Sequence, residues 1–445
     1  MSEHVGYVVK INELHPHSNA DRLQIATIFG TSVIVGLDIK IDDIGVYFPT
    51  DIQLSKEYCE NNNLVRKKDE NGNNVGGYLD PDKRNIRAMK LRGEKSDGLF
   101  MPLESLAYTG VTKFEVGEKI ETLNGHEICC KYIPRSNIRV GKVSSGNRTR
   151  KHSEPIAPLF AEHVDTEQLA YNLGAFKPND QIEITLKMHG TSQRTGYLPK
   201  FVGYKRTLLD KILRKQGAPV YDWGYVTGTR RVVLNDFEDG GYYGNNEFRA
   251  IHAKAFEGKL NKGETVYYEV VGFTTNGTPI MSSVSNSKIS DKAFTKQYGD
   301  TTVFSYGCSG NGSDFYVYRM TMTNEDGFVV EYSPDFMRYR CEQMGVKCVP
   351  MLEKAYIPSQ DILDTFNMTA GDWIKEKAEE YYDGPDPIGK THVREGVVVR
   401  IVNRPKFCAY KHKNFSFKVL EGLAKDIATE PDMEEAQEVV EDDNS

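Results

Sequence analysis

The sequence predicts an α+β protein in which a small N-terminal β-barrel precedes a larger domain of antiparallel sheet. Short alternations of apolar and polar residues at 5–11, 23–28, 32–36 and 44–48, separated by turn residues, are typical of a small barrel. Longer strand patterns mixed with helical patterns fill residues 157–424. At 445 residues the chain is long enough for two or three domains that each bury a core.

The larger domain is expected to mix strands with a few helices. Apolar residues spaced three or four apart predict helices, and alternating residues predict strands. The predicted helices are 165–175, 246–256, 333–344 and 372–382, and the predicted strands are 181–186, 226–234, 265–272, 315–321 and 327–332, followed by a hairpin of 394–401 and 408–413.

Two stretches lie outside the predicted domains. Residues 146–156 contain Ser, Gly and basic side chains, which is typical of a linker and places the first domain at 1–145. Residues 425–445 form an acidic tail, with eight acidic and no basic side chains from Glu430 onward, and we expect it to be disordered. Without those eight charges the formal net charge of −7 becomes about +1, so a nucleic-acid partner is not excluded.

The sequence also indicates the cellular compartment of the protein. No apolar run approaches the roughly 18 residues that span a bilayer, and the first residues lack a basic region followed by an apolar one. We therefore expect a cytoplasmic protein with no membrane partner, and we expect a monomer. The seven cysteines are odd in number and form no Cys-x-x-Cys pair, which argues against a zinc knuckle or a disulfide framework.

A basic stretch follows the predicted barrel strands. Such a stretch suits a phosphate backbone, because each neutralised phosphate releases counterions. A solvated loop is the alternative interpretation. The candidate residues for nucleic-acid contact are Lys83, Arg84, Arg87, Lys90, Arg92 and Lys95.

The run Leu-Lys-Met-His-Gly-Thr-Ser at 186–192 places a lysine at the end of an alternating strand and before a tight turn. Lys187 is therefore a candidate nucleophile, with His189 beside it. Taken alone, the run could equally be a surface turn. The residues downstream favour the nucleophile, because charged and aromatic groups follow in a specific order: Arg230 or Arg231, Glu269, Tyr318, Glu395, then Lys411 and Lys413.

In that order the second domain resembles the covalent nucleotidyltransferases, specifically the ATP-dependent RNA ligases of the nick-sealing RNA ligase 2 kind. The resemblance implies an antiparallel-sheet, ATP-grasp-like ligase domain in which Lys187 becomes covalently linked to AMP. It implies catalytic roles for Lys187, His189, Lys411 and Lys413 and a metal-binding role for Glu395. The nucleotide contacts that it implies are Leu186, Lys187, Arg230 or Arg231, Glu269, Tyr318, Glu395, Val398, Lys411 and Lys413, with adenine between Tyr318 and Val398.

The chemistry requires these residue types. An amine attacks a phosphate only in its neutral form, so the pKa of Lys187 must fall from about 10.4 through nearby cations or desolvation. Lys411 and Lys413 share one strand face because side chains alternate, so both ammonium groups can point at one phosphate and stabilise its developing charge. Glu395 offers the oxygen ligand that Mg²⁺ or Mn²⁺ accepts.

The sequence also departs from the pattern of these ligases. Leu186 stands where nick-sealing relatives can carry a glutamate that contacts adenine, so only a backbone carbonyl could make that contact here. Arg400 replaces a lysine at the end of the Glu395 motif, which keeps the charge but changes its geometry. Little chain follows Lys413, so the C-terminal barrel domain of DNA ligases and mRNA capping enzymes is not expected.

The N-terminal region carries two weaker resemblances. Residues 15–23 are similar to a signature of OB-fold tRNA-binding domains, although Asn19 and Asp21 also suit a plain turn. Residues 91–99 resemble a segment in the N-terminal domain of certain RNA ligases. We therefore expect an OB-like barrel that holds RNA at a nick or a paired end, including an RNA–DNA hybrid, in front of an ATP- and Mg²⁺- or Mn²⁺-dependent ligase domain. An mRNA capping-type guanylyltransferase and a non-catalytic RNA-binding protein are the alternatives.

Overall fold

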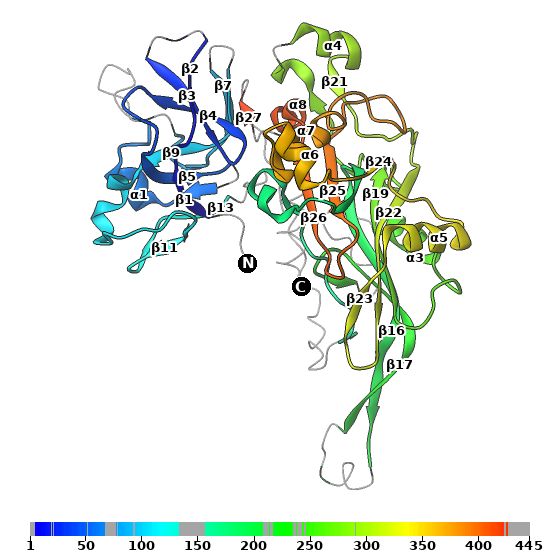
Figure 1. Cartoon of the computed structure of the whole chain (residues 1–445). Coiled ribbons are helices and arrows are strands. Elements are labelled where there is room, and N and C mark those ends of the chain that lie inside the picture. The colour runs from blue at the N-terminus through cyan, green and yellow to red at the C-terminus, as the bar shows by residue number, and fades with distance from the viewer. Residues whose placement is uncertain are drawn as a thin grey trace.

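In the computed structural model of this chain, the described residues are 5–18, 20, 22–50, 52–66, 77, 79–91, 94–132, 156–207, 213, 217–234, 237, 243, 246–289, 291–421 and 424–425. Most of the predicted linker, the predicted tail from residue 426 onward, Asn19, Asp21 and Arg92 lie outside these ranges. The first part of the chain, up to residue 132, is called the N-terminal module, and the described residues from 156 to 425 are called the C-terminal part (Figure 1). None of the helices in the described ranges has the length and apolar character needed to cross a membrane.

The N-terminal module is built from small antiparallel sheets, and its strands include all four that were predicted. One sheet has the order β10-β1-β5-β9 and a second the order β2-β3-β4, while β6 pairs with β13, β7 with β8, and β11 with β12. Across the described residues these sheets do not form one closed barrel. The elements are β1 (Gly6–Lys10), β2 (Leu14–Pro16), β3 (Leu23–Ile28), β4 (Thr31–Gly36), β5 (Ile44–Phe48), β6 (Ile52–Leu54), α1 (Lys56–Asn61), β7 (Ala88–Leu91), β8 (Glu94–Ser96), β9 (Leu99–Pro102), η1 (Leu103–Thr109), β10 (Lys119–Ile120), β11 (Thr122–Leu123), β12 (His126–Glu127) and β13 (Cys129–Lys131).

The C-terminal part contains two larger sheets. The first, with the order β14-β26-β25-β15-β24, has five strands, and the second, with the order β18-β17-β16-β19-β22-β23, has six. The strands of the five-stranded sheet are β14 (Glu167–Gln168), β15 (Gln181–Lys187), β24 (Met351–Tyr356), β25 (Gly396–Ile401) and β26 (Ala409–Lys413). Those of the six-stranded sheet are β16 (Thr191–Lys205), β17 (Ala218–Gly228), β18 (Val233–Leu234), β19 (Glu264–Gly272), β22 (Ser313–Thr323) and β23 (Val329–Glu331).

Helices and short elements complete the C-terminal part. Two hydrophobic cores lie on the sheets: one joins β19 and β22 to α3, α5 and α8, and the other joins β15 and β25 to α6 and α7. These remaining elements are η2 (Leu169–Tyr171), η3 (Leu173–Ala175), α3 (Glu247–Lys254), β20 (Val284–Ser285), η4 (Asn286–Lys288), α4 (Lys292–Tyr298), β21 (Thr301–Thr302), α5 (Pro334–Met344), α6 (Gln360–Thr365), α7 (Ala370–Glu379), α8 (Phe415–Leu420) and β27 (Ala424–Lys425).

Local sequence explains where the best-predicted helix begins and ends. The Ser333 hydroxyl accepts a hydrogen bond from the Phe336 backbone N–H, and Pro334 occupies the first helical turn of α5. Gly345 follows the helix with a left-handed backbone (φ 68°), which a glycine adopts without strain. Because these signals are local, the predicted helix at 333–344 is confirmed almost residue for residue.

Two predicted elements are wrong. The helix expected at 165–175 is instead β14 followed by the 3-10 turns η2 and η3, because β14 pairs in parallel with β26 and Leu169 is buried in the core. The strand expected at 226–234 is interrupted, since β17 ends at Gly228 and the chain turns before β18. Within that turn the Thr229 backbone N–H donates to the Val232 carbonyl, and the Val232 N–H donates to the Thr229 hydroxyl.

A tyrosine of the C-terminal part is inserted into an aromatic cluster of the N-terminal module. The ring centroid of Tyr171 lies 6.0 Å from that of Tyr7, 5.9 Å from that of Phe29 and 6.3 Å from that of Tyr47. Aromatic pairs at these separations contribute beyond the area that they bury. Tyr171 therefore fixes the two parts against each other, and it lies in the segment where the predicted helix fails.

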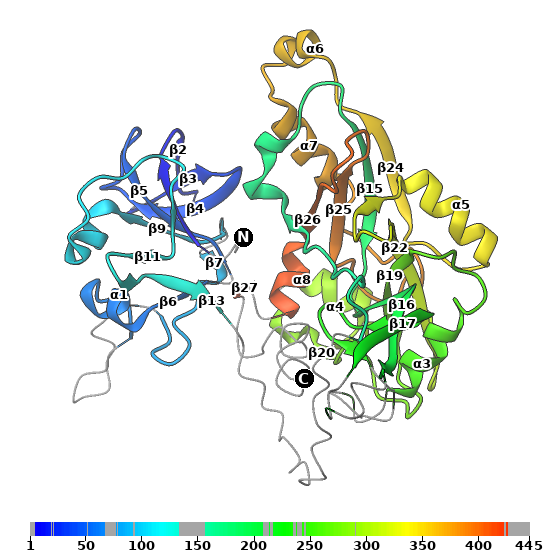
Figure 2. The ribbon, with the colours of Figure 1, turned by 90° about the horizontal axis from the view of Figure 1, so that it is seen from below.

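Further contacts join the two parts near α8. The Lys95 ammonium lies 4.5 Å from the centroid of the Phe415 ring, and the Lys418 ammonium lies 3.4 Å from a carboxylate oxygen of Asp97. Strand β27 pairs in parallel with β7 of the N-terminal module. Figure 2 shows α8 on the side of the C-terminal part that faces this module. Helix α8 thus contacts the N-terminal module as well as the hydrophobic core of the C-terminal part.

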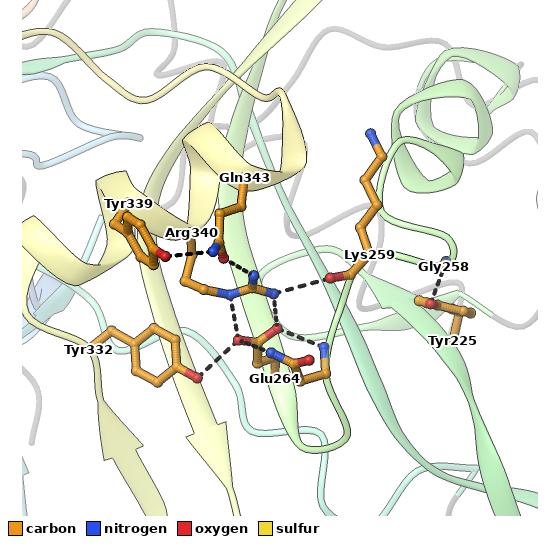
Figure 3. Close-up of polar contacts among 9 residues, drawn as sticks. Tyr225, Gly258, Lys259, Glu264, Tyr332, Tyr339, Arg340 and Gln343 are labelled. Carbon is orange, nitrogen blue, oxygen red and sulfur yellow. Dashed lines mark hydrogen bonds and ion pairs between the residues drawn. The ribbon is translucent and has the colours of Figure 1, made fainter.

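A buried ion pair attaches α5 to the six-stranded sheet (Figure 3). The Glu264 carboxylate at the start of β19 is fully buried and accepts two hydrogen bonds from the Arg340 guanidinium, at 2.9 and 2.8 Å, and one from the Tyr332 hydroxyl at 3.0 Å. Burial raises the pKa of Glu264, but the hydrogen bonds from Arg340 and Asn261 outweigh it, so its pKa lies below the usual range.

We expect Glu264→Ala to lower the free energy of unfolding by about 3 to 5 kcal/mol, because it leaves the Arg340 charge uncompensated. Urea denaturation followed by circular dichroism measures this change. The matched control, Glu342→Ala on the exposed face of α5, should change stability by less than about 0.5 kcal/mol. Replacing both partners, as Glu264→Leu with Arg340→Met, should recover most of the loss. A Glu264→Ala protein as stable as the control would contradict this role.

Candidate active site

A cavity of about 110 Å³ lies between the two large sheets. Its lining comes from β15, β25 and β26 of one sheet and from β16, β19 and β22 of the other. It is lined by six of the residues predicted to contact the nucleotide: Leu186, Lys187, Arg230, Glu269, Tyr318 and Val398. The structure therefore brings together, from five separate segments, side chains that the sequence could order but not place.

Lys187 is the last residue of β15 and lies at the cavity wall. It is opposite Gly396 of β25, which in turn is opposite Lys413 of β26, so the three residues form one row across the sheet. Gly190, three residues on, must be glycine, since a Cβ atom there would lie 2.3 Å from the Val270 carbonyl oxygen. The tight turn between Lys187 and the start of β16 depends on this close approach.

Gly396 is constrained in the same way. A Cβ atom at this position would lie 2.1 Å from the His412 carbonyl oxygen, and the backbone φ is 149°. Directly after Glu395, the backbones of β25 and β26 therefore approach so closely that only glycine fits. The Asn414 backbone N–H donates to the Glu395 carbonyl at 2.8 Å, which ties the start of β25 to the end of β26.

Four charged side chains meet at the end of this row. The Glu395 side chain has no solvent exposure, and its Oε1 atom lies 2.6 Å from the Lys187 Nζ atom and 3.3 Å from the Lys413 Nζ atom. The Lys413 ammonium also donates to both carboxylate oxygens of Glu421, at 3.0 and 2.8 Å. Two carboxylates and two ammonium groups thus balance, which a buried cluster requires.

His189 packs against this cluster. Its ring packs edge-on against those of Phe304 and Phe417, with centroids 4.6 and 4.8 Å away. Its Nδ1 atom lies 3.8 Å from Glu395 Oε2 and 3.9 Å from Glu421 Oε1. His189, predicted as a catalytic residue, thus lies beside the carboxylates of Glu395 and Glu421.

The chemistry of these donors fits a divalent cation. His189, Glu395 and Glu421 are all buried, and each brings one ligand atom within 4.8 Å of the others. Carboxylate oxygens bind Mg²⁺ and Mn²⁺, and an imidazole nitrogen is also a ligand for Mn²⁺. The predicted metal residue, Glu395, therefore lies among other metal-binding groups.

Tyr318 forms the opposite wall of the cavity because of a β-bulge. In the pairing of β19 with β22, Tyr267 is opposite Arg319 and Tyr268 is opposite Val317, so Tyr318 is the extra residue. Such bulges redirect a side chain and are common beside active sites. Burial, followed by the nearby Glu269 carboxylate, raises the pKa of Tyr318, whose hydroxyl therefore stays neutral and hydrogen-bonds to that of Ser192 at 2.9 Å.

Val398 and Leu186 take different places around the cavity. Val398 lies opposite Thr185 and Lys411, in the row two residues along from that of Lys187, so Lys411 shares a sheet face with Lys413 as predicted. The Leu186 side chain is instead part of the large hydrophobic core. Only its backbone is thus suitably placed for a contact with a nucleotide.

The structure distinguishes the two candidate arginines. Both lie in the turn between β17 and β18, and both pair with the carboxylate of Asp165, Arg230 at 3.3 Å and Arg231 at 3.7 Å. Arg230 lines the cavity, whereas Arg231 does not and is more exposed. Arg230 is therefore the better candidate for a nucleotide contact.

The structure describes five of the six basic residues predicted to contact nucleic acid. Arg84 donates to the backbone carbonyls of Leu54 and Pro81, Arg87 donates to Asn85, and Lys95 lies over Phe415. Lys83 is partly exposed, Lys90 lies on β7, and Arg92 is outside the described residues. Several of these charges thus have structural partners.

Sequence reasoning missed four residues of the site. His163 lies edge-on to Tyr318, with ring centroids 5.1 Å apart, and Ser192 hydrogen-bonds to the same tyrosine. Glu183 lines the cavity and pairs bidentately with Arg338 at 2.8 and 2.7 Å. Glu421 follows the last motif by eight positions, and no local spacing signals its return to Lys413. Arg400, noted as a departure, donates to the Tyr332 carbonyl at 2.8 Å.

Comparisons with known proteins give matches among solved structures. The chain is similar to a Naegleria gruberi RNA ligase with PPi, at 18% identity and a TM-score of 0.56 over 94% of this chain and 98% of that one. Two variants of the ligase match likewise: a lysine-to-alanine variant with ATP and Mn (17% identity, TM-score 0.55, 93% and 97% covered) and a glutamate-to-alanine variant with AMP and Mn (16%, 0.55, 93% and 98%). No protein-family model matches the chain, and no curated protein sequence does. At this level of identity the likeness establishes a shared fold.

If Arg230 contacts the nucleotide, Arg230→Ala should slow AMP transfer to the protein by about tenfold or more at subsaturating ATP, because a charged hydrogen bond is lost. Arg231→Ala should stay within about twofold, since an exposed ion pair contributes little. Label transfer from α-³²P-ATP, followed over time on denaturing gels, measures both rates. A larger effect from Arg231→Ala would reverse this assignment.

Proposed function

We propose that this chain is an ATP-dependent RNA ligase that joins a 3′-hydroxyl to a 5′-phosphate end through a lysyl-AMP intermediate. The observation that carries the proposal is the position of Lys187, which lies between the cavity lined by Tyr318, Glu269 and Arg230 and the charged cluster around Glu395. The fold shared with a ligase whose solved structures hold ATP, AMP, PPi and Mn supports it.

In the first step the cavity binds ATP. Adenine would lie between the Tyr318 ring and Val398, and Glu269 and Arg230 would contact the ribose and the phosphate side. The neutral amine of Lys187 attacks the α-phosphorus, so that a P–N bond forms while the bond to the bridging oxygen breaks and pyrophosphate leaves. Lys411 and Lys413 would stabilise the charge that develops on the phosphate.

Lys187 must part from Glu395 before it can attack, because a carboxylate at 2.6 Å favours the ammonium form. Glu395 would hold the divalent metal ion, which when bound supplies positive charge at the α-phosphate. The same buried carboxylate can thus serve as the partner of Lys187 before ATP binds and as a metal ligand afterwards.

In the second and third steps AMP passes from Lys187 to the RNA. The 5′-phosphate oxygen attacks the lysyl-AMP phosphorus and releases the lysine amine. The 3′-hydroxyl of the neighbouring end then attacks the adenylated phosphate and releases AMP. The net result is a phosphodiester bond.

The N-terminal module is proposed to be an OB-like domain, ending near residue 145 and followed by a linker to 156, that holds RNA at a nick or a paired end. Its partly exposed Lys83 and its fixed position beside α8 support this role. The ligase domain is proposed to span 157–424 and to act as a cytoplasmic monomer, repairing RNA and tolerating an RNA–DNA hybrid.

To test the proposal, a nicked duplex with RNA strands is incubated with ATP and Mg²⁺ or Mn²⁺. We expect wild-type protein to seal the nick and Lys187→Ala to reduce sealing by at least about a thousandfold, since the nucleophile is lost. Lys187→Ala should still seal a nick whose 5′-phosphate is already adenylated. Lys177→Ala, which replaces an exposed lysine shortly before β15, serves as the control.

Three outcomes would count against the proposal. Covalent label from GTP but not ATP would favour a capping-type guanylyltransferase. Undiminished sealing by Lys187→Ala would show that another group carries AMP, and RNA binding without label from either nucleotide would favour a non-catalytic RNA-binding protein.

A further inference from the structure

We propose that His189, Glu395 and Glu421 form a protein-ligated site for Mn²⁺ that fills before ATP binds, and that the Lys413 ammonium occupies this site until the metal displaces it. The inference rests on the proposed function for the use of the site. Its evidence is the arrangement of buried donors around Lys413, and its test needs neither ATP nor RNA.

The spacing of the three donors suits direct metal coordination. His189 Nδ1 lies 3.8 Å from Glu395 Oε2 and 3.9 Å from Glu421 Oε1, and all three ligand atoms lie within 4.8 Å of one another. In an octahedral site with bonds near 2.1 Å, neighbouring ligands lie about 3 Å apart and opposite ligands about 4.2 Å. Small side-chain rotations would therefore bring the three atoms around one ion.

The charge of the cluster shows that a cation belongs there. Glu395 and Glu421 are both buried, and two buried carboxylates this close are costly without positive charge between them. The Lys413 Nζ atom supplies it, at 3.3 Å from Glu395 and at 3.0 and 2.8 Å from the two oxygens of Glu421. The ammonium group thus takes the place that a metal ion between the same carboxylates would take.

The donor set favours Mn²⁺ over Mg²⁺. Mg²⁺ prefers oxygen ligands and keeps much of its water, whereas an imidazole nitrogen suits the transition metals. The His189 ring is held by Phe304 and Phe417, and its backbone N–H donates to the Tyr306 hydroxyl at 2.7 Å. Phe417 lies on α8, and Glu421 directly follows that helix as its C-cap, so one helix positions both the ring and the third ligand.

Displacement would put Lys413 to use. Because Lys187 remains beside Glu395, an incoming divalent ion gives the cluster excess positive charge. The metal ion then binds both carboxylates that now pair with Lys413, so Lys413 is the group that is released. The triphosphate of ATP would then be the nearest source of negative charge for the released ammonium. Metal loading would in this way turn Lys413 from a structural partner into a phosphate ligand.

The test is a titration of the full-length, nucleotide-free protein with Mn²⁺, in which the electron paramagnetic resonance signal reports free Mn²⁺. Glu421→Gln should weaken Mn²⁺ binding about tenfold or more, because one charged ligand is lost. Lys413→Met should tighten it by about the same factor, because the competing cation is removed. Lys413→Arg, which keeps the charge, and Glu376→Gln, an exposed acid on α7, should bind like wild type.

The opposite signs of the two main effects make the test decisive. Equal Mn²⁺ affinity in Glu421→Gln and wild type would overturn the proposal, and so would unchanged or weaker binding by Lys413→Met. Circular dichroism of each variant excludes a folding defect, and Glu421→Asp, with intermediate affinity, replaces Glu421→Gln if that variant does not fold. A protein that binds Mn²⁺ in this pattern but accepts no AMP refutes the ligase function alone. A protein that accepts AMP, but whose Mn²⁺ affinity is unchanged by Glu421→Gln, refutes this inference alone.

Discussion

The buried carboxylate of Glu395 is the constraint on which the rest of the site depends. A carboxylate with no solvent exposure is costly unless cations pair with it, and Lys187 and Lys413 supply them from two different strands. The pairing requires β15, β25 and β26 to align so that Lys187, Gly396 and Lys413 form one row. One electrostatic requirement thus fixes the register of the sheet and brings the candidate nucleophile to the cavity wall.

The six-stranded sheet, helix α8 and the N-terminal module contribute the remaining parts of the site. A bulge in β22 turns Tyr318 toward Val398, which gives the cavity one wall from each sheet. Helix α8 carries Phe417 and is followed directly by Glu421, so it brings both residues to the charged cluster. Because the N-terminal module contacts α8 through Lys95 and Asp97, a change in its position would also be felt at Lys413.

The sequence predicts those features that depend on local pattern. The strands β15, β19, β22, β25 and β26 and the helix α5 follow from alternation or from capping residues, and the order of the charged motifs predicts which side chains meet. Features set by distant contacts are not predictable in this way. Parallel pairing with β26 overrides the helical spacing at 165–175. A turn directs Arg230, but not Arg231, to the cavity. Glu421 reaches Lys413 only because α8 folds back.

Lys187 is proposed to be the residue that accepts AMP, and peptide mapping by mass spectrometry can identify that residue. The protein is incubated with ATP and Mn²⁺, digested at neutral pH and searched for a peptide that carries AMP. We expect one acid-labile adduct, on Lys187, which is absent when Glu395 is replaced by Gln. An adduct on Lys411 or Lys413, or AMP found only noncovalently bound, would contradict it.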